Sequence, residues 1–178
     1  DVLGGALIGR ADLIRTIRDL HGVLGGVIDP HTSYLILRGV KTLALRVERA
    51  NRNAEAISRY LEQHRRIERV HYPGLESHRD HAVARRLMKG FGGVISFEVR
   101  GSLETASKFI DALRIPYIAP SLGGVESLVE QPTVVSYWDK TPEERAALGI
   151  RDNLVRYSCG VEDTDDLIRD IEQALDRA

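Results

Sequence analysis

The most regular pattern in the sequence is an apolar stripe that begins at Ile36 and ends at Leu61. Its members are spaced alternately by four and three residues, as on one face of an α-helix: Ile36, Val40, Leu43, Val47, Ala50, Ala54, Ile57 and Leu61. The stripe predicts one helix of about 30 residues, far longer than the usual three turns. Such helices often bridge two domains or pair with a partner. A free coiled coil is the alternative, although Gly39 and the alanines favour closer packing.

Shorter helices follow from the same spacing and from the residues at their starts. Thr141, followed by a proline and two glutamates, is a strong helix start, because a hydroxyl caps the first turn and acids favour the positive end of the helix dipole. Helices are predicted at residues 11–20, 78–88, 103–113, 141–149 and 163–175. The glycines beyond residue 20 and the Asp29-Pro30 pair indicate a loop at residues 22–30.

Strands are indicated where apolar residues alternate or run together between turns. Such runs occupy residues 67–72, 94–99, 115–119, 134–137 and 153–159, and residues 1–9 are compatible with a buried strand or its end. From about residue 66 onward the elements therefore alternate between strand and helix and finish with a helix. This order predicts an α/β sandwich with helices on one side of a small sheet.

Composition narrows the range of partners and compartments. The 178 residues are enough for one sizeable core, and 25 basic residues nearly balance 26 acidic ones. This balance gives no electrostatic reason to expect nucleic acid or an anionic membrane as a partner. No apolar run approaches the roughly 20 residues that span a bilayer. The single cysteine, Cys159, favours a reducing compartment, which we expect to be the cytoplasm. The start lacks an initiator methionine, so we expect a segment of a longer polypeptide.

Two stretches are candidates for holding a small carboxylate. Residues 121–128 (Ser-Leu-Gly-Gly-Val-Glu-Ser-Leu) follow a strand-like run, and adjacent glycines let a ligand approach the main chain closely. Further along, Arg156 lies inside the strand-like run at residues 154–160, where alternation puts Leu154, Arg156 and Ser158 on one face. The pattern alone leaves an ordinary turn as the alternative.

Two histidines three residues apart, His78 and His81, raise the question of a metal site. A third ligand of convincing spacing is not apparent in the sequence near them, and histidines at a surface or a helix start are common. We therefore expect no metal in this chain.

Six motifs, taken in order, resemble those of a known enzyme family. They are residues 1–5 (Asp-Val-Leu-Gly-Gly), 37–43 (Leu-Arg-Gly-Val-Lys-Thr-Leu), 72–75 (Tyr-Pro-Gly-Leu), 90–93 (Gly-Phe-Gly-Gly), 121–128, and 156–163 (Arg-Tyr-Ser-Cys-Gly-Val-Glu-Asp). Together they resemble the pyridoxal-phosphate enzymes of cysteine and methionine metabolism, which include cystathionine γ-synthases, γ-lyases and β-lyases. Residues 115–120 and 136–139 make the chain most similar to plant-like γ-synthases.

The resemblance implies the C-terminal part of a fold-type I enzyme, the fold of the aspartate-aminotransferase class. Residues 1–52 would be the end of the large cofactor domain and the start of a bridging helix, and residues 53–178 the small α/β domain. The lysine that carries pyridoxal phosphate would fall just upstream of residue 1, so no catalytic residue is expected in this chain. The cofactor would be held mainly upstream. Four lysines do not match that position: Lys41, Lys89, Lys108 and Lys140.

The resemblance also implies roles for four residues. Arg156 would clamp the substrate's α-carboxylate, because its planar fork gives two parallel charge-assisted hydrogen bonds. Ser121 matches a second carboxylate contact, to which the main chain of Leu122 would add a donor. Ser136 stands where the family often has a threonine near the same carboxylate.

Each assignment has a purely structural alternative. In the alternative, Arg156 is a strand arginine that pairs with an acid such as Glu162, and Ser121 is a hydroxyl that belongs to a turn. We expect Glu126 and Glu162 to brace the loop and the strand, and we expect Cys159 to be a small buried residue.

The reaction implied is γ-replacement, in which cysteine displaces the acyl group of an O-acylhomoserine to give cystathionine. Pro120 slightly favours this reading, because some γ-lyases carry an acid there. Cystathionine γ-lyase, cystathionine β-lyase, methionine γ-lyase and O-acylhomoserine sulfhydrylase activities remain open. The family implies a homotetramer built as a dimer of dimers. Alternatives of another class are an isolated non-catalytic module and an oligomeric scaffold that uses the long helix.

Overall fold

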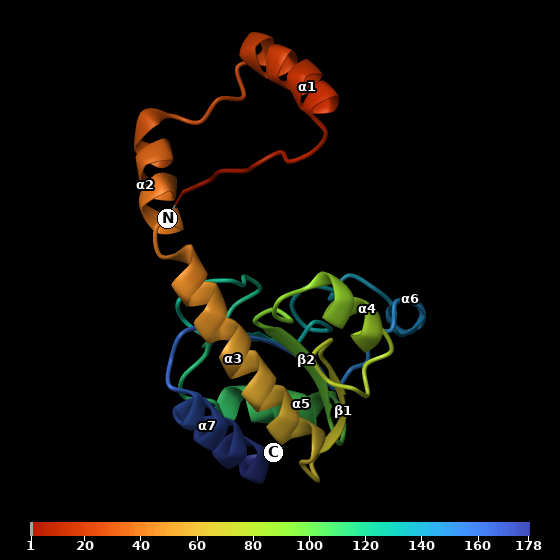
Figure 1. The fold of residues 1–178 in the computed structure, drawn as a ribbon. Helices are drawn as coiled ribbons and strands as arrows, with labels where there is room; N and C mark the ends of the chain where they lie inside the picture. Colours follow the sequence, from red (N-terminus) through yellow and green to blue (C-terminus); the bar gives the residue numbers. More distant parts are fainter. Residues whose placement is uncertain (1) are drawn as a thin grey trace. The chain divides into compact units, whose positions relative to one another are not determined.

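The computed structural model describes residues 2–178, which divide into two compact units. The first unit ends at Ala44, and the second comprises Leu45–Ala178. Helices α1 (Ala11–Leu24) and α2 (Pro30–Val40) belong to the first unit, and the whole sheet belongs to the second (Figure 1). The assignment of residues 1–52 to a cofactor domain stays a prediction.

The strand expected at the start of the chain does not form in the described residues. Residues 2–10 have no regular structure, and Leu3 and Ile8 are almost fully exposed. A strand needs a neighbouring strand to pair its N–H and C=O groups, and no strand lies within the described residues of the first unit. No helix among residues 2–178 has both the length and the apolar character that crossing a membrane requires.

The expected loop at residues 22–30 is shorter than predicted. Helix α1 continues to Leu24 and ends at Gly25, whose φ of 75° is a left-handed conformation that suits glycine at a helix end. Helix α2 begins within the same stretch. Its Asp29 carboxylate caps the first turn by accepting hydrogen bonds from the N–H groups of His31 and Thr32, and Pro30 supplies a preset φ.

The predicted 30-residue helix is two helices, because α2 ends before α3 (Leu43–Glu62) begins. At the break, the N–H of Lys41 bonds to the carbonyl of Arg38 at 3.3 Å, and that of Thr42 to the carbonyl of Gly39 at 3.4 Å. These bonds span three residues and form tight turns in place of α-helical turns. The apolar spacing continues across the break, so the periodic pattern alone does not reveal it.

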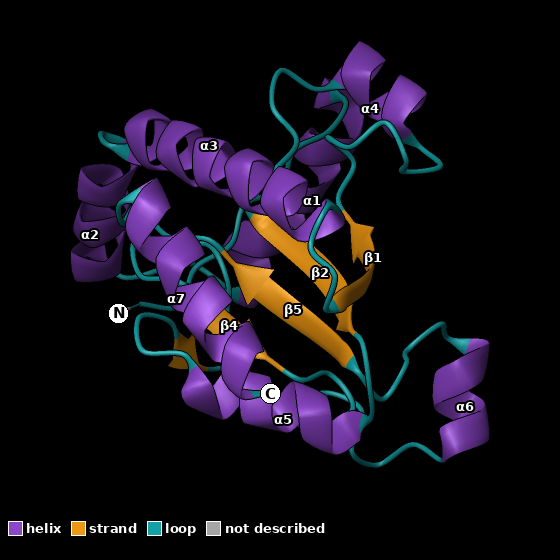
Figure 2. Ribbon diagram, turned by 90° about the horizontal axis from the view of Figure 1, so that it is seen from below, coloured by secondary structure: helices purple, strands orange, loops and turns teal. Residues whose placement is uncertain are grey.

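The second unit is built on a five-stranded sheet of order β1-β2-β5-β4-β3 (Figure 2). Neighbouring strands are antiparallel, except β3 and β4, which are parallel. The strands are β1 (Ile67–His71), β2 (Val94–Val99), β3 (Tyr117–Ile118), β4 (Leu128–Glu130) and β5 (Leu154–Ser158). The position of β5 beside β4 places the end of residues 121–128, hereafter the Gly-Gly loop, next to the strand that carries Arg156.

Three helices cover one face of the sheet, as the sequence predicts (Figure 2). They are α3, α5 (Leu103–Ala112) and α7 (Thr164–Arg177). Val155 and Tyr157 of β5 are completely buried in the core beneath them. The short helices α4 (His81–Leu87) and α6 (Pro142–Ala147) lie away from these three (Figure 1).

The strand predicted at residues 134–137 is a turn, and a neighbouring strand replaces it. The N–H groups of Val134 and Val135 both bond to the carbonyl of Gln131, and that of Ser136 bonds to the carbonyl of Pro132. These local bonds curl the chain and exclude pairing in the sheet. The strand lies earlier, at β4, where all three residues are buried.

Candidate functional site

Arg156 lies on the face of β5 opposite the three helices. Val155 and Tyr157 point into the core, so the period-two alternation of the strand directs Arg156 to the other face. In the register of the sheet, Arg156 is the partner of Ser96 on β2 and of Glu130 on β4. The predicted alternation is thus confirmed, and both neighbouring strands fix the backbone of the arginine.

The guanidinium of Arg156 is held on two sides. Its Nη1 lies 2.8 Å from Oε1 of Glu130, and its Nη2 donates to the carbonyls of Pro120 at 2.6 Å and Ser121 at 3.1 Å. The Glu130 side chain is 2% exposed and that of Arg156 is 22% exposed. The ion pair is therefore largely desolvated, and removing either partner would leave a poorly solvated charge. The structural alternative, a strand arginine paired with an acid, is therefore met in part: the acid is Glu130, not Glu162, which was given as the example.

Ser136 reaches the same glutamate from the turn after β4. Its Oγ donates to Oε2 of Glu130 at 2.9 Å, so both carboxylate oxygens of Glu130 are engaged. The resemblance places Ser136 near the substrate carboxylate, which stays a prediction, and in the structure its hydroxyl contacts the acid that holds Arg156. Sequence reasoning missed Glu130 altogether, because its role comes only from the pairing of β4 with β5.

The Gly-Gly loop is fastened at both ends to the segment that follows Arg156. Near its start, the N–H of Gly123 donates to Ser158 Oγ at 3.2 Å. At its end, Ser127 donates through its N–H and its Oγ to the carboxylate of Glu162, at 2.6 and 2.9 Å. The N–H of Gly160 in turn donates to Ser127 Oγ at 2.9 Å. Glu162 thus braces the loop, as expected.

Two glycines make this arrangement sterically possible. Gly123 has a φ of 81°, a conformation that side chains disfavour. A Cβ on Gly160 would collide with the carbonyl oxygen of Val125 and come within 2.5 Å of the carbonyl carbon of Glu126. The loop therefore packs directly on the main chain beyond β5.

Ser121 and Leu122 present unused polar groups close to Arg156. The main chain of Ser121 already contacts the guanidinium through its carbonyl. Within the described part of the chain, the Ser121 hydroxyl and the Leu122 N–H make no hydrogen bond, and both residues are exposed. One guanidinium, one hydroxyl and one N–H are all donors, and this set suits a carboxylate ligand.

The remaining candidates contribute no chemistry to this site. Cys159 is buried, and burial raises the pKa of its thiol. His78 accepts a hydrogen bond from the N–H of Asp80, and His81 contacts the carbonyl of Pro73. No cluster of three or more possible metal ligands is found within residues 2–178.

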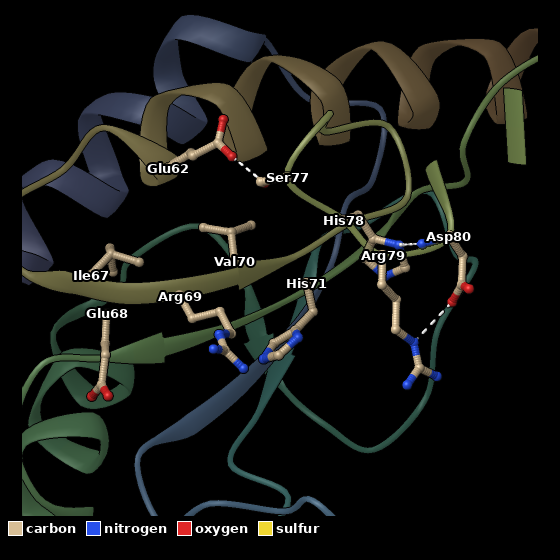
Figure 3. Close-up of a pocket in the computed structure, with 10 residues that line it drawn as sticks. All are labelled: Glu62, Ile67, Glu68, Arg69, Val70, His71, Ser77, His78, Arg79 and Asp80. Carbon is tan, nitrogen blue, oxygen red and sulfur yellow. Dashed lines mark hydrogen bonds and ion pairs between the residues drawn. The ribbon is translucent and has the colours of Figure 1, made fainter. Parts of the chain in front are cut away.

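A cavity of about 650 Å³ lies elsewhere in the second unit, along the edge strand β1 (Figure 3). Arg69 and His71 lie on one side of the strand and Val70 on the other (Figure 3). None of the predicted site residues lines this cavity. Its lining includes acids and bases, among them Glu68 and Arg79, so its charge selects neither anions nor cations.

The fold is that of the C-terminal part of a fold-type I pyridoxal-phosphate enzyme, as a comparison with a solved structure shows. A cystathionine γ-lyase (CalE6) from Micromonospora echinospora has the same fold, with a TM-score of 0.88 and 36% sequence identity over 95% of this chain and 44% of that one. The sequence model of the Cys/Met metabolism PLP-dependent enzymes matches residues 1–176. The chain therefore belongs to that family.

Two curated relatives place the chain within the family. It is 56% identical over 176 residues to cystathionine gamma-synthase 1, chloroplastic, of Nicotiana tabacum, a match that covers 99% of this chain and 33% of the relative. It is 44% identical over 176 residues to the cystathionine gamma-lyase of Dictyostelium discoideum, covering 99% and 46%. The chain thus spans about a third of the tobacco synthase and less than half of the lyase.

Proposed function

We propose that the complete protein is a pyridoxal-phosphate enzyme that joins an O-acylhomoserine and cysteine by γ-replacement to give cystathionine. The observation that carries this proposal is the fixed guanidinium of Arg156 beside the unused donors of Ser121 and Leu122. This arrangement suits the α-carboxylate of an amino acid, which is common to every substrate of the proposed reaction.

The contribution of this chain is to orient the substrate. A bond at Cα must stand perpendicular to the cofactor ring before it breaks, and a pinned carboxylate fixes that rotation. Arg156 provides a planar, permanently charged donor for the carboxylate, and the Ser121 hydroxyl and Leu122 N–H provide further hydrogen bonds. Pyridoxal phosphate, when bound, takes up the electron pair released at Cα.

The residues described here fit a role in orienting the substrate, while the cofactor carries out the chemistry at Cα. None of the four lysines (Lys41, Lys89, Lys108 and Lys140) matches the position of the family's cofactor lysine, whereas the Ser121 hydroxyl and the Leu122 N–H are donors that suit a carboxylate. We therefore assign cofactor attachment and proton transfer at Cα and Cβ to the rest of the protein. The clamp alone does not perform the chemistry.

The choice of γ-replacement rests on the relatives and on Pro120. The tobacco synthase is 56% identical to this chain, compared with 44% for the Dictyostelium lyase. Proline at position 120 offers no acid beside the loop. The lyase activities are the second candidate, because the solved structure described above is a γ-lyase with the same fold.

We further propose a homotetramer built as a dimer of dimers, with sites at the dimer interfaces, and a reducing compartment such as the cytoplasm. The single cysteine supports the latter. The tobacco relative is named as chloroplastic, so the compartment is to be tested by localising the complete protein.

The experiment is a product assay on the complete protein with bound cofactor. It is supplied with O-acetyl-, O-succinyl- or O-phosphohomoserine, each with and without cysteine. Formation of cystathionine only with both substrates supports the proposal. In a separate reaction the protein is supplied with cystathionine, and release of a 2-oxo acid and ammonia there, without synthesis in the first assay, would favour the lyase candidate instead.

A further inference from the structure

Glu130 occupies an unusual position for an acid, because it is almost completely buried in β4, between strands β5 and β3. It is 1% exposed, and both of its carboxylate oxygens are in use. Oε1 meets Arg156 Nη1 at 2.8 Å, and Oε2 accepts from Ser136 Oγ at 2.9 Å. A buried carboxylate stays charged only when such partners replace water. The three side chains therefore form one connected row: Ser136, Glu130, Arg156.

Each end of this row is fixed by backbone structure. Glu130 and Arg156 are direct partners in the antiparallel pairing of β4 with β5. Ser136 is held by the turn after β4, in which its N–H donates to the carbonyl of Pro132 at 3.0 Å. The side chain of Gln131 anchors the start of that turn by donating to the carbonyls of Leu103 and Asp152. The row thus has little freedom to rearrange.

The hydrogen bonds determine what Ser136 is able to do. A hydroxyl has one hydrogen to donate, and Ser136 donates it to Glu130. A carboxylate ligand only accepts hydrogen bonds, so Ser136 has nothing left to offer it. Arg156, by contrast, has five N–H donors, and its Nε makes no hydrogen bond within residues 2–178.

We propose that Glu130 is a positioning residue that fixes the plane of the Arg156 guanidinium, and that Ser136 acts on the substrate only through Glu130. The inference rests on the proposed carboxylate clamp and adds to it. It replaces the direct substrate contact expected for Ser136. Glu130 holds Nη1 while the carbonyls of Pro120 and Ser121 hold Nη2, so the guanidinium keeps one orientation and leaves its Nε–H for an incoming carboxylate.

The test measures recognition of the carboxylate itself in the complete enzyme with its cofactor. Norleucine and norleucinamide differ only in the α-carboxyl group, and their dissociation constants are read from changes in the visible spectrum. The dissociation constant of norleucinamide divided by that of norleucine measures how strongly the clamp recognises the carboxylate. A defect that merely loosens the fold weakens both ligands equally and leaves the ratio unchanged.

We expect Glu130→Gln to lower this ratio at least tenfold and Ser136→Ala to lower it about threefold, with Ser136→Thr restoring it. In the Glu130→Gln background, Ser136→Ala has no additional effect, because its route to the arginine is already lost. Glu98→Gln is the matched control. Glu98 is also a buried acid on this face of the sheet, but it pairs with His71 and Arg151, so the ratio is unchanged.

Two results would overturn the inference. An unchanged ratio in Glu130→Gln would make Glu130 purely structural. An equal loss from Ser136→Ala in both backgrounds would mean that Ser136 contacts the substrate directly. If Glu130→Gln does not fold, Ser136→Ala and Ser136→Thr decide whether the inference holds. A wild-type ratio in Ser136→Ala would mean that Ser136 does not act through Glu130. If Arg156→Lys also keeps the ratio, the carboxylate clamp itself is wrong.

Discussion

Nη1 of Arg156 lies 2.8 Å from Oε1 of Glu130, and the two residues face each other across the β4–β5 pairing. They are far apart in sequence, and the antiparallel register alone brings them together. The carbonyls of Pro120 and Ser121, at the start of the Gly-Gly loop, accept hydrogen bonds from the other arm of the guanidinium. A change in the loop, in β4 or in β5 should therefore affect the same functional group.

Ser127 is expected to stabilise the loop through its hydroxyl. Ser127→Ala would leave the buried N–H of Gly160 without its acceptor and Glu162 without one of its donors. An unsatisfied buried group costs about 1–3 kcal/mol, so the free energy of unfolding should fall by that amount in urea titrations. Ser77→Ala, which removes an exposed hydroxyl that donates to Glu62, is the control and should change it by less than ~0.5 kcal/mol. Equal effects would contradict this role.

Asp170 should be a second anchor, at the joint between α7 and the segment after α5. Its buried carboxylate accepts hydrogen bonds from the N–H groups of Arg114 and Ile115. Asp170→Asn replaces one oxygen by a donor, and we expect a loss of about 1.5–3 kcal/mol in the free energy of unfolding. Asp166→Asn, one turn earlier on the same helix and exposed, should have little effect. A small loss in both variants would mean that the anchor is dispensable.

The thiol of Cys159 predicts a stability change at alkaline pH. Burial raises its pKa, and the nearby Glu162 carboxylate adds to the shift. The unfolded chain loses this proton near pH ~8.5 and the folded chain does not, so folding stability is fully present below that pH and falls above it. The slope contributed is at most ~1.4 kcal/mol per pH unit.

Urea unfolding of the chain and of Cys159→Ala between pH 8 and about 10 checks this prediction, because titrations that the two proteins share cancel in the comparison. The variant should show a flatter dependence on pH. Parallel curves would mean that the thiol is accessible to water. Reaction of the native thiol with a disulfide reagent at pH 8 should likewise be slow and should become fast in urea.

Local signals were enough to predict most of the second unit. Strand β2 falls at the predicted residues 94–99, and Thr141 caps the start of α6 as predicted, with Glu144 completing a capping box. The α7 helix begins after Asp163, which caps it. These features are set by alternation and capping, which depend on neighbours in sequence.

The features that the sequence did not predict depend on contacts between residues far apart in the chain, or on breaks that the apolar pattern does not mark. Strand β4 ends in Glu130, and nothing local marks an acid as a buried strand residue whose charge is met by an arginine on the next strand. The break between α2 and α3 was not predicted, because the apolar spacing continues across Lys41 and Thr42. The pattern alone made Arg156 and the loop that begins at Ser121 candidates, and the family resemblance proposed their roles, whereas the partner that holds the arginine required the sheet register.

The most direct test of the carboxylate clamp is a titration of the complete enzyme and its Arg156→Lys variant with amino-acid substrate, followed by the visible spectrum of the cofactor. Lysine keeps the charge but loses the planar fork. We predict that the apparent dissociation constant rises by a factor that corresponds to ~2–5 kcal/mol, while the spectrum without substrate is unchanged. Arg151→Lys, which alters an exposed arginine paired with Glu68 just before β5, should bind as the wild type does. An Arg156→Lys enzyme with an unaltered response to substrate concentration would contradict the clamp.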